Sequence, residues 1–222
     1  MKKAFTLSEV LITLGIIGVV SAVTIPSLVN NIQDKHFKAL LKKTYSDISN
    51  AYELVNQEVP LYVTNQWGGV IGDRTAIAQQ AYYGIFSRLN TTSFCVKDYL
   101  DRPCTNDENF HNHVTCNSLI SDSDTCAWDA MGGYAFLPNG VKIYAHGYLW
   151  SYPILLVDVN GDKNPNIVGR DLFVLYIRNK IIPAGAPGYE AKGCDKSIKS
   201  NSGLVDAVSK SGSGCAYKYL YE

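Results

Sequence analysis

The chain has 222 residues, of which 46% are hydrophobic and 18% are charged. This composition supports a packed core and excludes wholesale disorder. Twenty Lys and Arg residues balance twenty Asp and Glu residues, so the formal net charge is zero. A nucleic-acid binder that relies on neutralising phosphates would show a basic excess, so no specific nucleic-acid partner is evident.

Close to the start of the chain, an apolar run from Phe5 to Val29 contains a single charged residue, Glu9. The uninterrupted part after Glu9 is twenty residues long, enough for a helix to cross the roughly 30 Å hydrocarbon core of a bilayer. Lys2 and Lys3 precede the run, and the next positive charge is Lys35. The positive-inside rule therefore predicts a cytoplasmic amino terminus, with everything after the helix outside.

A cleavable secretory signal peptide is the alternative interpretation of this run. Val20-Ser21-Ala22 offers the small residues at which a signal peptidase cuts. The apolar run continues past that point and is long for a signal peptide. Glu9 also argues against it, because a carboxylate at membrane depth costs about 2.5–3.5 kcal/mol, and such charges usually have a partner.

The ordered segment Ala4-Phe5-Thr6-Leu7-Ser8-Glu9-Val10-Leu11-Ile12-Thr13-Leu14 resembles the cleavage and methylation segment of prepilins. That family comprises type IV pilins, the pseudopilins of type II secretion and competence pilins. The resemblance implies cleavage between Ala4 and Phe5, N-methylation of Phe5, and a Glu9 that stands fifth in the mature chain. The family usually has glycine before the cut, where this chain has Ala4. Pro26 falls where many pilins bend this helix.

The resemblance also implies a domain organisation. Residues 1–4 would be a leader peptide, and residues 5–29 the transmembrane and assembly half of a spine helix. Residues 30–222 would form an extracytoplasmic pilin-like globular domain that includes the rest of the spine helix. In a filament, Glu9 of one subunit would face the amino terminus of a neighbour, where breaking one side of a buried ion pair costs about 3–5 kcal/mol.

The function implied by the resemblance is that of a structural subunit of a type IV pilus or a type II secretion-like pseudopilus. Its expected partners are a prepilin peptidase/N-methylase and other pilin subunits in a helical filament. It would lie in the bacterial inner membrane before assembly, and in the pilus or pseudopilus afterwards. The sequence leaves open whether the filament is a surface pilus, a secretion pseudopilus or a DNA-uptake pilus, and whether the subunit is major or minor.

The helix is expected to continue well past Val29. Apolar residues recur at spacings of four, three, four and three, the period of one helical face: Leu41, Tyr45, Ile48, Tyr52 and Val55. Pro60 closes the pattern, and Pro26 interrupts at most one backbone hydrogen bond. The sequence therefore predicts one helix of roughly fifty residues, packed on a domain in its second half. A second helix is predicted over residues 74–90.

Six cysteines lie in the second half of the chain: Cys95, Cys104, Cys116, Cys126, Cys194 and Cys215. An even number confined to one region favours disulfides formed outside the cytoplasm. Residues 91–133 are expected to be irregular and held by two local disulfides. Cys194 and Cys215 are expected to close a looped tail that begins at Ile182. Six cysteines allow fifteen pairings, so the connectivity stays open.

Strands are predicted between these regions. Residues 134–137 and 141–145 flank Pro138-Asn139-Gly140, a hairpin signal, and residues 153–157 and 172–177 have high β-propensity. A spine helix followed by antiparallel strands predicts an α+β fold. In it, a long amino-terminal spine helix packs on a small antiparallel β-sheet, with a disulfide-bonded loop region and a carboxyl-terminal loop.

The connection between the last two predicted strands is rich in oxygen-bearing side chains. Asp158, Asn160, Asp162 and Asp171 are candidate calcium ligands, because calcium takes six to eight oxygen ligands. Some pseudopilins bind calcium in a similar loop. The alternative is a connection built from Asx-turns that needs no metal, since Asp and Asn side chains stabilise turns by bonding their own backbone.

No catalytic motif is present: the sequence lacks a nucleophile elbow, a zinc-protease helix motif, a P-loop and a dinucleotide fingerprint. We therefore expect a protein that is not an enzyme. The alternative function is a membrane-anchored or secreted extracytoplasmic binding or hydrolytic domain with an ordinary signal sequence.

Overall fold

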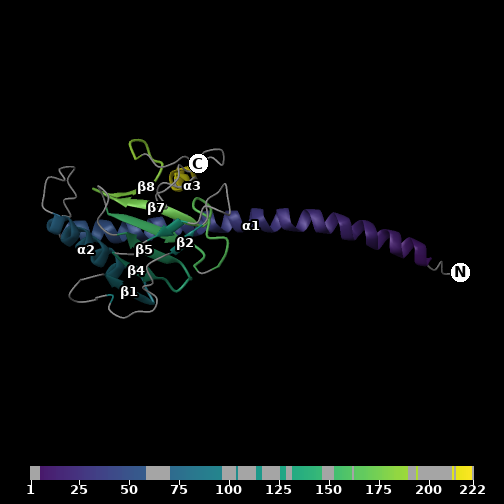
Figure 1. Cartoon of the computed structure of the whole chain (residues 1–222), viewed down its shortest axis with the longest axis horizontal. Coiled ribbons are helices and arrows are strands. Elements are labelled where there is room, and N and C mark those ends of the chain that lie inside the picture. The colour runs from purple at the N-terminus through teal and green to yellow at the C-terminus, as the bar shows by residue number, and fades with distance from the viewer. Residues whose placement is uncertain are drawn as a thin grey trace. The chain divides into compact units, whose positions relative to one another are not determined.

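The computed structural model describes residues 6–58, 71–96, 104, 114–116, 126–128, 132–146, 153–161, 163–189, 194, 212 and 214–221. Its helices are α1 (Leu7–Glu58), α2 (Ile71–Arg88) and α3 (Cys215–Tyr221). Its strands are β1 (Ser93–Val96), β2 (Val114–Cys116), β3 (Cys126–Trp128), β4 (Gly133–Phe136), β5 (Lys142–His146), β6 (Ile154–Asp158), β7 (Leu172–Ile177) and β8 (Ile181–Pro183) (Figure 1). The predicted α+β class is confirmed.

The chain divides into two compact units, residues 1–36 and 37–222. The sequence places its boundary at residues 29 and 30, where the apolar run ends. The second compact unit begins at Phe37, the first residue of α1 that is buried. The predicted domain boundary depends on where a membrane would end and stays a prediction. The first unit ends where α1 begins to pack against the sheet and α2, which is a few residues after the end of the apolar run at Val29.

Helix α1 confirms the predicted long helix: it runs for 52 residues and continues through Pro26. Four of the five residues in the predicted stripe are buried, namely Leu41, Ile48, Tyr52 and Val55. The fifth, Tyr45, is half-buried, and its hydroxyl donates to the carbonyl of Ile181 at 3.1 Å. The apolar period of the second half of α1 thus marks the face that packs in the second unit.

The main sheet has six strands in the order β1-β4-β5-β6-β7-β8, and every neighbouring pair is antiparallel. Strands β2 and β3 form a separate antiparallel pair. The predicted hairpin joins β4 to β5 through residues 137–141, where Leu137 N donates to Val141 O at 2.9 Å. Gly140, the last of the three residues between that bonded pair, has a φ of +88°, and its N–H donates to Leu137 O at 3.0 Å. Such loops use a left-handed residue at their end, which glycine adopts without strain.

Both faces of the sheet are covered by apolar side chains. One face packs with α1 and α2 in a core cluster, to which β5, β6 and β7 contribute Ile143, Ala145, Leu155, Val157, Phe173, Leu175 and Ile177. The helices approach each other closely at Gly84, where a Cβ atom would lie 2.7 Å from Val55 Cγ1. The opposite face carries a second cluster with Tyr134, Tyr144, Ile154, Leu156, Val174 and Tyr176.

Two regions differ from the sequence expectation. Residues 91–133, expected to be irregular, contain β1, which pairs with β4, as well as β2 and β3. The expected looped tail contains β8 and α3. These elements are three to seven residues long, so their periodicity is too short to read, and long-range partners define them. Tyr219 of α3, for example, packs edge-to-face on Phe173 of β7 at 6.0 Å between ring centroids.

Two disulfides are described in the second unit. Cys194–Cys215 closes the tail as predicted, and Cys95–Cys104 is one of the expected local bridges. Cys116 and Cys126 are register partners across β2 and β3. The tail is also held by backbone contacts, because Tyr217 N donates to Ala184 O at 3.1 Å.

Candidate functional site

The first candidate site is the apolar part of α1 in the first unit. Its large apolar side chains are between 41% and 77% exposed from Leu7 to Ile32. They are Leu7, Val10, Leu11, Ile12, Leu14, Ile16, Ile17, Val19, Val20, Val23, Ile25, Leu28, Val29 and Ile32. Among the described residues, α1 is the helix whose length and composition suffice to cross a membrane. A helix that is apolar all round requires an apolar environment, which a bilayer or a bundle of like helices provides.

Glu9 and Thr6 together close the amino-terminal end of this helix. The Thr6 backbone N–H and the Thr6 hydroxyl both donate to Glu9 Oε2 at 2.8 Å, and Glu9 N donates back to Thr6 Oγ1 at 3.3 Å. This reciprocal pattern is a capping box, in which two backbone donors at the helix start gain partners. Glu9 therefore has a partner within its own chain, a role that the sequence reasoning missed although the Thr-x-x-Glu spacing signals it.

Two threonines in this stretch form hydrogen bonds to the backbone of the helix itself. Thr13 Oγ1 donates to Val10 O and Thr24 Oγ1 donates to Val20 O, both at 2.9 Å. Pro26 lies inside the helix and has no N–H to donate to the carbonyl four residues earlier. The predicted processing residues, Ala4 and Phe5, lie outside the described residues.

The second candidate site is the connection between β6 and β7. Asp158 and Asp171 stand at its two ends, 3% and 0% exposed, and Val159 N donates to Asp171 O at 2.9 Å across them. Asp158 Oδ1 accepts hydrogen bonds from Asn160 N at 3.2 Å and from Gly161 N at 2.9 Å. The bond to the residue two positions on is the Asx-turn of the alternative interpretation.

Asp171 is held by a similar set of backbone donors. Its Oδ2 accepts from Asn166 N at 2.8 Å, and its Oδ1 accepts from Ile167 N at 2.6 Å. Burial raises the pKa of Asp171, and these two N–H groups oppose the rise. Burial also raises the pKa of Asp158 to about 7; the Asn160 and Gly161 N–H groups oppose this, and the negative charge of Asp171 adds to it.

The fit of a calcium ion can be judged from the oxygens of this loop. Asp158, Asp171 and Asn160 come together as predicted, whereas Asp162 lies outside the described residues. Asn160 Oδ1 is buried and has no hydrogen-bond partner among the described residues, while its Nδ2 donates to Lys163 O and Asn164 O. Each carboxylate oxygen that already accepts an N–H keeps a second lone pair. Within the described residues, no three acidic, His or Cys side chains group to hold a metal, so calcium stays a prediction.

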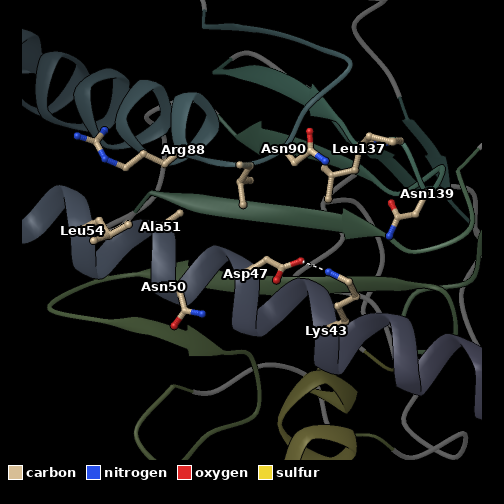
Figure 2. Close-up of a pocket in the computed structure, with 11 residues that line it drawn as sticks. Lys43, Asp47, Asn50, Ala51, Leu54, Arg88, Asn90, Leu137 and Asn139 are labelled. Carbon is tan, nitrogen blue, oxygen red and sulfur yellow. Dashed lines mark hydrogen bonds and ion pairs between the residues drawn. The ribbon is translucent and has the colours of Figure 1, made fainter.

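The second unit also contains a pocket of about 440 Å³ that the sequence did not signal. Its walls come from α1, the end of α2 and the β4–β5 loop, as Figure 2 shows. Lys43 and Asp47 of α1 form an ion pair of 2.7 Å in its wall, and Arg88 of α2 bonds to Glu58. Three separated segments build this pocket, so no local sequence pattern marks it.

A comparison of the chain with protein-family models, with curated proteins and with solved structures finds no match.

Proposed function

We propose that this chain is a non-enzymatic filament subunit, anchored in the bacterial inner membrane by α1 and polymerised through the same helix. The observation that carries the proposal is the stretch from Leu7 to Ile32, whose large apolar side chains are all at least 41% exposed. Exposed apolar patches of this extent on a soluble protein mark contact with a membrane or a partner. The prepilin-like segment at its start supports a filament of pilin or pseudopilin type.

The orientation proposed for the anchor follows from charge and from the cysteines. Lys2 and Lys3 favour a cytoplasmic amino terminus. The disulfides Cys95–Cys104 and Cys194–Cys215 belong to the second unit, which the proposal places outside the cytoplasm. Disulfides persist in oxidising compartments, so this orientation and the bridges agree.

Intact-mass spectrometry of the native protein tests processing. A chain that starts at Phe5 and carries one added methyl group supports the filament subunit. A chain that starts at Val23 supports the alternative, a secreted domain with an ordinary signal sequence. That cut would fall inside α1, which is continuous from Leu7 to Glu58. The pocket in the second unit is the observation that favours the alternative, because its volume lies within the range of ligand sites.

The proposed assembly role of Glu9 is tested by two substitutions. Glu9→Ala removes both the carboxylate charge and the capping box, and we expect incorporation into filaments to fall while the second unit keeps its disulfides. Glu9→Gln is the matched control, because glutamine also completes a capping box. Equal loss in both variants, measured as the subunit fraction in sheared filaments, assigns the role to the charge. Normal incorporation of Glu9→Ala would remove the pairing argument.

A further inference from the structure

The chain contains two Asn-Gly dipeptides, Asn139–Gly140 and Asn160–Gly161. In such a dipeptide, the glycine nitrogen can attack the side-chain carbonyl carbon of the asparagine, since glycine has no Cβ in the way and a freely varying φ. Both glycines have positive φ, +88° and +67°. The dipeptides are also neighbours in space, because a Cβ on Gly161 would lie 2.6 Å from Gly140 O.

The hydrogen bonds around Asn139 do not hinder attack by the Gly140 nitrogen on its side-chain carbonyl carbon. It lies in the exposed loop between β4 and β5, and Figure 2 shows it at the end of the pocket where Lys43 and Asp47 pair. Its Oδ1 accepts a hydrogen bond from Val141 N at 3.2 Å, which draws electrons from the side-chain carbonyl. Among the residues that the structure describes, none accepts a hydrogen bond from its Nδ2, the leaving nitrogen. The Gly140 N–H donates to Leu137 O, a neutral bond in a solvent-exposed turn.

At Asn160, by contrast, both the leaving nitrogen and the attacking nitrogen are engaged in hydrogen bonds within the fold. Its Nδ2 donates to Lys163 O at 3.0 Å and to Asn164 O at 3.2 Å. The attacking nitrogen, Gly161 N, is buried and donates to the carboxyl of Asp158 at 2.9 Å. Ring closure at Asn160 would break all three bonds, one of them to an acidic group.

We propose that Asn139 is a site of spontaneous deamidation and that the fold protects Asn160. The Gly140 nitrogen forms a bond to Asn139 Cγ, the bond from Cγ to Nδ2 breaks, and the proton from Gly140 N leaves with ammonia through solvent. Water then opens the cyclic imide at either carbonyl carbon, which yields aspartate or isoaspartate at position 139. No oxidant or enzyme is needed, since water is the one co-reactant.

The consequence is a new charge in the pocket. The described charged side chains that line it are Lys43, Asp47 and Arg88. A carboxylate at position 139 would add a second acidic group to the pocket that Lys43 and Asp47 also line, and would lower the net charge of the chain by one. Deamidation therefore changes the electrostatics of this pocket without changing the gene.

Incubation of the oxidised full-length chain in detergent, in mildly alkaline buffer, tests the proposal. Fragment mass spectrometry would follow the replacement of the amide nitrogen by oxygen at each asparagine. We expect position 139 to convert at least about tenfold faster than position 160, since a hydrogen bond to a charged group must break at the latter. In denaturant, where neither dipeptide is held, the two rates should become similar.

The controls use the same chain. Asn139→Gln should abolish the fast conversion, and Asn160→Gln should leave it unchanged. Conversion of Asn160 in the folded chain at the rate of Asn139 would overturn the proposal. So would an Asn139 that converts in denaturant but is inert in the folded chain, because the turn would then protect it too.

Discussion

The two parts of helix α1 use apolar residues in opposite ways. From Leu7 to Ile32 the large apolar side chains point in all directions and are exposed, whereas from Phe37 onward the buried ones recur on a single face. One continuous helix thus presents two different distributions of apolar side chains along its length. The difference lies in periodicity, because an all-round apolar helix suits a membrane or bundle and a one-sided helix suits a packed domain.

The largest expected effect is on the free energy of unfolding, and it distinguishes the two parts of α1 by the same Leu→Ala substitution made once in each part. Leu41→Ala should lower the free energy of unfolding of the second unit by about 2–5 kcal/mol, since Leu41 is 0% exposed and the change leaves a cavity. Leu14→Ala, at a side chain 60% exposed, should leave it within about 0.5 kcal/mol. Denaturant unfolding of both full-length variants in detergent checks this. Equal destabilisation would mean that the two parts do not behave separately.

The second effect concerns pH and the buried carboxyls of the second unit. The pKa of Asp158 is raised to about 7, so the folded chain holds this proton more tightly than the unfolded chain. Its contribution to stability is complete below about pH 4 and is lost as the pH rises through about 7, a loss on the order of 4 kcal/mol. The raised pKa of Asp171 acts in the same direction.

Thermal unfolding across this pH range measures the loss. Asp158→Asn has no proton to lose there and keeps an oxygen to accept the two N–H groups, so its stability should change less with pH. An identical pH dependence in both proteins would contradict the assignment to Asp158.

The third effect is the response to calcium. Free calcium at one hundred times its dissociation constant would stabilise the second unit by about 2.7 kcal/mol. The melting temperature should then drop on chelation, recover with calcium and lose this response in Asp158→Ala, while Asp47→Ala responds like the unaltered chain. A melting temperature that is the same in millimolar calcium and in excess chelator would favour the Asx-turn alternative.

The smallest effect is local to the helix start. Thr6→Val removes the hydroxyl that accepts from Glu9 N and donates to Glu9 Oε2. We expect faster amide hydrogen exchange over the first turn of α1 and no change in the second unit. Thr13→Val is the control, because its hydroxyl bonds only the turn before it. Unchanged exchange in Thr6→Val would mean that the box does not hold the helix start.

The sequence predicts those elements whose signal is local. The stripe from Leu41 to Val55 and the Asn139–Gly140 turn reveal their structures because helix period and turn chemistry act over a few residues. Strands β1 and β8 escape prediction because pairing with β4 and β7 defines them. The pocket escapes for the same reason. At the aspartate loop, composition predicts the oxygens but not which of them the backbone N–H groups already occupy.

The disulfide Cys194–Cys215 has a mechanical consequence. It spans 21 residues, and Cys95–Cys104 spans nine. An extended chain gains up to about 3.6 Å per residue, so the two disulfides together shorten the fully extended length of the unfolded chain by roughly 100 Å. When the chain is pulled until it unfolds, it would therefore reach a shorter full extension with its disulfides oxidised than with them reduced. Covalent bonds, and not the packing of the core, would set this difference in length.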